Sequence, residues 1–129
     1  MRCFPFVVIF AFLQVAYGQV LFNEGCNKNA FAVTDENGDS PDWIELYNPN
    51  SAAIDLTNWE LKDDDDTHVF AIPDGTQIEG EGFLVLVKNE TNFSSVLPEV
   101  PYVGELNFGF GGSDAVRLYD PNGTLQDEV

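Results

Sequence analysis

Basic residues are scarce in this sequence. Its 129 residues contain five Lys and Arg against 22 Asp and Glu, so the formal net charge is −17. Nucleic-acid binding needs clustered Lys and Arg against the phosphates, and anionic membrane surfaces attract basic segments, so neither nucleic acid nor a membrane is expected as a partner. Cations and basic proteins are the partners that such a charge attracts.

Histidine and cysteine are rare as well. His68 is the only histidine, which excludes a metal site built from several histidines and leaves His68 as the one residue around which a Ser-His-Asp arrangement could be built. We therefore predict no catalytic residues, no cofactor beyond weakly bound calcium, and no enzymatic activity. Of the two cysteines, Cys26 has no internal partner once Cys3 is removed with the segment described next. We expect it to be buried and inert; the alternative is a disulfide to another chain.

Long apolar runs are absent except at the start of the chain. Arg2 precedes an almost unbroken apolar run over 4–15, and the small residues of Ala16-Tyr17-Gly18 follow it. This pattern predicts a signal peptide over 1–18, too short in its apolar part to span a bilayer, and a secreted mature chain that starts at Gln19. Three sequons fit an exported protein, and the predicted glycosylation sites are Asn89, Asn92 and Asn122.

The mature chain has no helical apolar periodicity of ten or more residues. Short alternating segments separated by turn residues predict an all-β sandwich in a single domain. The expected strands are 20–22, 42–47, 54–56, 59–62, 69–72, 76–78, 83–87, 106–108, 115–119 and 124–129, with a long loop over 89–105 and a hairpin turn over 120–123. The expected core includes Trp43, Phe83, Val85 and Leu118.

Several motifs resemble the lamin tail domain family. They are Trp-Ile-Glu-Leu-Tyr-Asn-Pro over 43–49, Asp-Leu-Thr-Asn-Trp over 55–59, Phe-Ala-Ile-Pro-Asp-Gly-Thr over 70–76 and Leu-Tyr-Asp-Pro-Asn-Gly over 118–123. The resemblance covers nearly all of 19–129 and implies an immunoglobulin-like β-sandwich. Because a signal peptide stands where nuclear lamins have a coiled-coil rod, we expect an exported relative without a filament role. The family pattern continues beyond the hairpin, so either the natural chain is longer or its last strand is short.

One candidate calcium site is an acidic loop with carboxylates at alternate positions around a glycine. Calcium takes six to eight oxygen ligands, and a tight turn rich in Asp and Asn can supply several. The loop is not an EF-hand, because Ser40 stands at the position of the invariant glycine and Leu46 at that of the bidentate glutamate. The alternative is an ordinary turn-rich loop. The candidate ligands are Asp35, Asn37, Asp39 and Asp42.

A second acidic run consists of four consecutive aspartates. Their mutual repulsion recruits cations, but side chains in a flexible run do not form a preorganised site, so we expect weak, delocalised calcium attraction here. His68 beside the run is expected to be a solvated loop residue. The residues of this run are Asp63, Asp64, Asp65 and Asp66.

These features together predict a secreted, acidic, non-enzymatic structural or interaction protein of an extracellular matrix, for example the organic matrix of a calcified shell or skeleton. Its expected partners are matrix components or a mineral surface, and its expected state is a monomer or weak dimer. Two alternatives stay open. One is a module detached from a larger secreted hydrolase or nuclease. The other is a carbohydrate- or protein-binding domain, although Trp43 and Trp59 are expected in the core rather than on a sugar-stacking surface.

Overall fold

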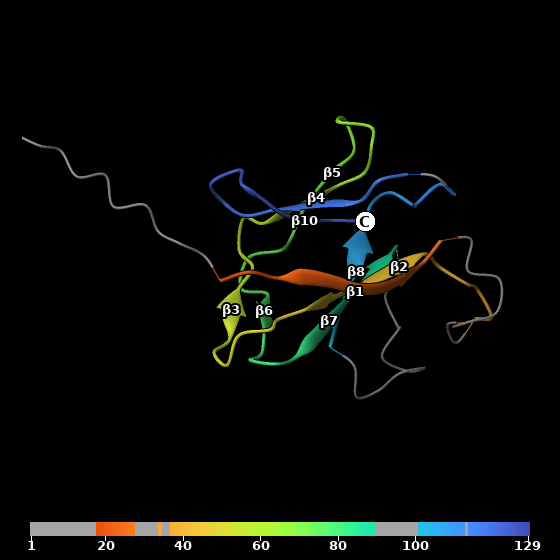
Figure 1. Ribbon diagram of the computed structural model, residues 1–129. Helices are drawn as coiled ribbons and strands as arrows, with labels where there is room; N and C mark the ends of the chain where they lie inside the picture. Colours follow the sequence, from red (N-terminus) through yellow and green to blue (C-terminus); the bar gives the residue numbers. More distant parts are fainter. Residues whose placement is uncertain (1–17, 28–33, 35–36, 90–100, 113) are drawn as a thin grey trace, which may run out of the picture.

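A computed structural model describes residues 18–27, 34, 37–89, 101–112 and 114–129, and within them every regular element is a β-strand (Figure 1). The first sheet contains, in spatial order, β1 (Leu21–Cys26), β2 (Trp43–Tyr47), β7 (Phe83–Lys88) and β8 (Tyr102–Leu106). The second contains β10 (Leu125–Glu128), β9 (Arg117–Tyr119), β4 (Glu60–Lys62) and β5 (Val69–Ala71). The short strands β3 (Ile54–Asp55) and β6 (Gln77–Ile78) pair with each other. The predicted all-β class is confirmed.

The core lies between the two four-stranded sheets, and alternation along the strands builds it. In β2, Ile44 and Leu46 are buried while the residues on either side of them are half-buried, because successive side chains of a strand point to opposite faces. From the second sheet Leu61 and Leu118 reach the same core with no exposed surface, joined by Trp59 just before β4. Trp59 is thus a core residue, as predicted.

The outer face of the first sheet corrects part of the predicted core. Val85 is buried as expected, but Trp43 is only half-buried and packs against Val85 and Val87 in a small cluster outside the main core. The prediction for Phe83 was wrong, since its side chain is 43% exposed. Phe83 shares the outward face with Val85, and it stacks on Tyr47 with ring centroids 4.9 Å apart rather than entering the core.

The strand β8 corrects the predicted topology. Residues 102–105 were assigned to a long loop, yet Tyr102–Leu106 is a strand that pairs with β7 in parallel, with Val85 opposite Tyr102 and Leu86 opposite Val103. The alternation is weak here because Gly104 carries no side chain, and the pairing partner lies far away in the sequence. Each of the other nine predicted strands overlaps an observed one.

A buried asparagine holds the turn that follows β2. Asn48 has no exposed surface, and its side-chain Nδ2 donates to the carbonyl oxygens of Ala52 at 2.8 Å, Ile78 at 3.2 Å and Glu79 at 3.0 Å. Its Oδ1 accepts a hydrogen bond from the backbone N–H of Asn50 at 2.9 Å. One neutral amide therefore fastens the predicted turn to the end of β6, with both its oxygen and its nitrogen satisfied.

The N-terminal end of the described chain packs into the domain at Val20, which is fully buried. The predicted signal peptide lies outside the described residues except for Gly18. Within the described part, no helix is long and apolar enough to cross a membrane.

Candidate binding sites: an acidic loop and an edge pocket

The loop between β4 and β5 is ordered by its own carboxylates. Asp63 Oδ1 accepts a hydrogen bond from the backbone N–H of Asp65 at 2.8 Å, and Asp65 Oδ1 accepts from the backbone N–H and the hydroxyl of Thr67 at 2.9 and 2.7 Å. These are successive Asx turns, in which an aspartate side chain bonds to the backbone two residues further on. The run is therefore less flexible than expected at Asp63 and Asp65, and weak, delocalised calcium attraction by the four aspartates stays a prediction. The bonds from Thr67 lower the pKa of Asp65.

Asp63 is buried, with only 3% of its surface exposed, although a run of aspartates is expected to lie in solvent. Its Oδ2 lies 2.8 Å from His68 Nδ1, and the imidazole stacks on Phe108 with centroids 5.7 Å apart. The hydrogen bond to Asp63 raises the pKa of His68; burial of the ring opposes this, and the charges of Asp63, Asp65 and Asp114 add to it. His68 is thus a fixed partner of a buried carboxylate rather than a merely solvated loop residue.

The sequence carries a signal for this burial that the prediction missed. Trp59 and Leu61 alternate inward along β4, and the same period of two places Asp63 on the inward side. Arg117 on the neighbouring strand binds the outer part of the loop, since its Nη2 donates to Asp66 Oδ1 at 3.0 Å and to the main-chain oxygen of Asp63. The bond to Asp66 raises the pKa of Arg117, which stays charged.

A third carboxylate approaches the loop from a distant segment. Asp63, Asp64 and Asp114 each offer a ligand atom, and these atoms lie within 4.8 Å of one another. Calcium would need at least three further oxygens, and the Asp63 oxygens already hold His68 and Asp65. The group can attract a cation but does not form a closed site. Asp114 was not predicted, because only the fold brings it to this loop.

The other predicted calcium loop is described only in part. Asp35 lies outside the described residues; Asn37 and Asp39 are exposed, and Asp42 is half-buried. Asp42 Oδ2 accepts a hydrogen bond from the backbone N–H of Phe110 at 3.0 Å, so this carboxylate anchors a neighbouring segment. Among the described residues, neither Asp39 nor Asp42 belongs to a group of three such ligands. Calcium binding by this loop stays a prediction.

Two of the three predicted glycosylation sites lie among the described residues, and both are exposed. Asn89 is exposed immediately after β7, and Asn122 is exposed in the turn between β9 and β10. That turn has the predicted form: Gly123 has φ 76°, and Asp120 accepts hydrogen bonds from the backbone N–H groups of Asn122 and Thr124. Asn92 lies outside the described residues. Glycosylation of all three stays a prediction.

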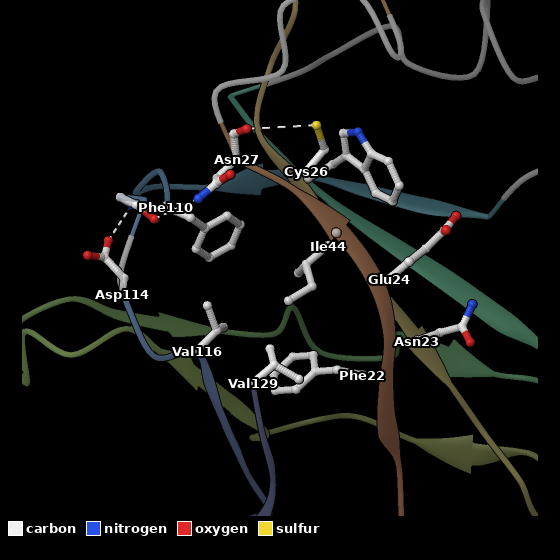
Figure 2. A pocket seen from close by; sticks show the side chains of 13 residues that line it. Phe22, Asn23, Glu24, Cys26, Asn27, Ile44, Phe110, Asp114, Val116 and Val129 are labelled. Carbon is white, nitrogen blue, oxygen red and sulfur yellow. Dashed lines mark hydrogen bonds between the residues drawn. The ribbon is translucent and has the colours of Figure 1, made fainter.

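A pocket of about 300 Å³ opens between β1 and the segment that precedes β9 (Figure 2). Figure 2 shows Phe22 and Ile44 of the first sheet turned toward apolar side chains of the segments that flank β9 and β10. Its wall includes Glu24, the half-buried Cys26 and Asp114. The apolar side chains are Phe22, Ile44, Phe110, Val116 and Val129.

Cys26 lines this pocket and is less buried than predicted. It is a free thiol and only half-buried, and its Sγ lies 3.8 Å from the main-chain oxygen of Asn27. It is therefore not sealed in the core, as expected for an inert cysteine, but reaches a surface cavity. Pairing with another chain stays a prediction.

The geometry around the single histidine favours charge stabilisation over catalysis. Its Nδ1 faces Asp63, and its Nε2 lies 4.0 Å from Asp65 Oδ2, a second carboxylate. A catalytic base would instead present its second nitrogen to a nucleophile. Two carboxylates around one imidazole favour its protonated form.

Comparison with known proteins identifies a family to which the sequence is similar. The sequence matches the model of the lamin tail domain over residues 16–129, nearly the whole chain. A search of curated proteins found no significant match.

Proposed function

Because the chain belongs to the lamin tail domain family, whose immunoglobulin-like fold is non-catalytic, we propose that it acts as a binding protein and not as an enzyme. Specifically, it is an exported acidic protein of an extracellular matrix, and its carboxylates bind calcium ions or a calcium-bearing surface collectively. The organic matrix of a calcified structure is the setting in which this property has a use.

The observation that carries the proposal is the distribution of charge over the sandwich. In the described part of the chain every acidic side chain except Asp63 and Asp120 is at least partly exposed. Two of the basic side chains are already paired within the molecule, Lys62 with Glu60 at 3.1 Å and Arg117 with Asp66 at 3.0 Å. The remaining carboxylates produce a negative surface potential that concentrates divalent cations.

Export is supported by the signal-like N-terminus and by exposed sequons at Asn89 and Asn122. The sugar-binding alternative has less support, because Trp59 is fully buried and Trp43 is half-buried against Val85 and Val87.

Calorimetric titration with calcium, on glycan-free protein at two salt concentrations, tests the proposal. Collective binding by exposed carboxylates should be weak and involve several ions, and it should weaken strongly with salt, since the screening length at 0.1 M is only about 10 Å. The double variant Asp64→Asn/Asp114→Asn should bind fewer calcium ions than the wild type. The control Lys62→Gln, which removes a positive charge, should not lower the number of bound calcium ions. Absence of any binding at millimolar calcium would overturn the mineral-matrix proposal, and a single salt-insensitive ion would contradict its collective character.

A further inference from the structure

Strand β5 ends the second sheet and leaves one of its sides open to pairing. Among the described residues, β4 is the only strand that pairs with it, and the pair is antiparallel. The backbone N–H of Ile72 donates to the main-chain oxygen of Trp59 at 2.9 Å. Because an antiparallel ladder uses every second residue, Phe70 bonds to β4 in the same way. Val69 and Ala71 therefore turn their backbone N–H and C=O groups away from β4.

These outward groups can receive another strand. In the described part of the chain, the N–H and C=O groups of Val69 and Ala71 have no hydrogen-bond partner. Their side chains are exposed as well, that of Val69 to 36%. An edge of this kind is a template for strand addition, in which main-chain bonds supply affinity and neighbouring side chains supply selectivity. The opposite side of the sandwich offers less, because Phe22 of β1 is there bonded to Asp127.

Acidic residues stand at both ends of the β5 edge. Asp65 precedes the strand with a side chain that is 53% exposed, and Asp74 is exposed in the turn that follows it. The basic side chains beside the edge are already paired. Lys62 on β4 lies 3.1 Å from Glu60, and His68 faces two carboxylates. The potential along the edge is therefore negative.

The same charges argue against a second copy of this chain as the guest. Two molecules paired along β5 would bring their Asp65 and Asp74 ends together, and each molecule carries a formal net charge of −17. Like charges directly opposite one another destabilise a strand pair. A basic segment is attracted by the potential that repels a second copy.

We propose that the β5 edge binds an extended, Lys- or Arg-bearing segment of another protein, which adds to the second sheet beyond β5. The backbone of this segment bonds to Val69 and Ala71, and its basic side chains lie toward the Asp65 and Asp74 ends. The interaction needs no metal ion. It therefore stands or falls independently of calcium binding by the surface carboxylates.

Two peptides test the charge requirement: acetyl-Lys-Thr-Val-Thr-Val-Thr-Lys-amide and the same peptide with Glu at both ends. Titrations are followed by NMR on the ¹⁵N-labelled, glycan-free protein, with a chelator present to remove calcium. The lysine peptide should bind about tenfold more tightly than the glutamate peptide, since each exposed ion pair contributes up to about fivefold. The difference should narrow as salt is added.

Backbone methylation of the lysine peptide tests strand addition. Alternate N–H groups of an added strand point toward β5, and the others point to solvent. Methyl groups on the nitrogens of the Thr residues or, separately, of the Val residues should therefore abolish binding in one case only. Unchanged binding in both cases would overturn the proposal.

Amide exchange shows where the peptide lies. In the free protein the amides of Val69 and Ala71 should exchange fast, and those of Phe70 and Ile72 slowly. At about nine-tenths occupancy the amides of Val69 and Ala71 should slow by about tenfold, because only the free protein exchanges. Protection of β8, the edge of the first sheet, without protection of β5 would contradict the assigned site.

A proline variant removes one outward donor. Ala71→Pro deletes an N–H that faces away from β4, a position at which an edge strand tolerates proline. It should lower the affinity for the lysine peptide about fivefold, the contribution of one hydrogen bond, whereas Ala71→Thr should bind like the wild type. If Ala71→Pro does not fold, the methylated peptides still decide.

Matched double variants test the acidic ends. Asp65→Asn/Asp74→Ser should bring the two peptides toward equal affinity, and Asn at 65 keeps an acceptor for the Thr67 backbone. Glu24→Gln/Glu128→Gln removes two exposed charges from the opposite side of the sandwich and should preserve most of the difference. Equal affinity of both peptides for the wild type, or an equal loss in the two double variants, would overturn the proposal.

Discussion

The two ends of strand β2 are fastened by opposite chemistries. Beyond Tyr47, Asn48 holds the turn with a neutral, fully buried amide. Before Trp43, Asp42 holds Phe110, and the same end of the sandwich carries Asp114 next to the buried Asp63. The first end is held by neutral partners, the backbone carbonyl groups and Asn50. The second is held by carboxylates, one of which faces the imidazole of His68.

The two ends should therefore differ in how strongly pH and salt affect them. A neutral amide bonded to backbone carbonyls keeps its strength across pH and salt, because none of its partners titrates. A carboxylate paired with an imidazole changes strength as the imidazole gains or loses its proton. We therefore expect the Asn48 end to determine stability and the Asp63 end to make stability depend on conditions. The following predictions are ordered from the largest effect to the smallest.

Asn48→Asp should break the neutral end. A carboxylate would face the three carbonyl oxygens of Ala52, Ile78 and Glu79 without a donor, and an uncompensated buried charge costs roughly 3–5 kcal/mol. Denaturant unfolding at pH 7 measures the loss. The loss of stability relative to the wild type should shrink as the pH falls toward about 4, where the new carboxyl group can take up a proton and become a donor. Asn107→Asp, the same change at an exposed position, should cost little. Equal losses in both variants would contradict the assigned role of Asn48.

Asp63→Asn should weaken the charged end by about 2 kcal/mol, a typical contribution for hydrogen bonds to a charged group. The amide retains an acceptor for the Asp65 backbone but loses the charge that faces His68. Unfolding curves give the size of the loss, and the NMR titration of the single histidine should show its pKa moving downward. Asp64→Asn, the exposed neighbour, serves as the control. An unshifted histidine would mean that Asp63 does not hold it in solution.

Phe83→Ala should cost only about 1 kcal/mol, although the residue is a large aromatic one. Its ring is 43% exposed, and its main contact is the stacking on Tyr47, an interaction in the range of roughly 0.5–1.5 kcal/mol. Leu84→Ala on the same strand, 3% exposed, should cost about 2–5 kcal/mol. Comparable losses in thermal unfolding for the two variants would place Phe83 in the core after all.

The smallest effect concerns pH. Asp63 raises the pKa of His68 above its ordinary value of 6.5, so protonated His68 stabilises the folded state. That contribution is fully present below about pH 6.5 and is lost as the pH rises through the raised pKa. The stability difference between the wild type and His68→Gln should accordingly decline toward alkaline pH. Because the imidazole is half-exposed, screening by solvent limits how much this ion pair contributes to stability. A difference that grows with pH would reverse the assigned sign.

Local patterns predicted the parts of this molecule whose pairing is local. The hairpin between β9 and β10 followed from Asp120-Pro121-Asn122-Gly123, since a turn with Gly at positive φ needs only its own residues. Strand β2 followed from its alternating residues. Strand β8 did not, because its parallel partner Phe83–Lys88 lies earlier in the chain, across a connection longer than any hairpin turn.

The candidate sites show the same limit. The four aspartates beginning at Asp63 suggested a solvated run, yet the alternation continuing from Leu61 buries the first of them. Asp114 reaches that loop only through the fold, and the pocket exists because β1 and the segment before β9 come together. No spacing along the sequence encodes such proximity. Residue chemistry was predictable, and its assembly into sites was not.

The contact between the first and last strands sets the order in which the chain can mature. Phe22 is bonded to Asp127, and Val116 exchanges two backbone hydrogen bonds with Val129. A chain growing on a ribosome cannot make these bonds until residues 127–129 have left the exit tunnel. Contacts so far apart in sequence are also slow to form. The sandwich therefore cannot close until the segment that contains β10 has been synthesised, although β1 is made first.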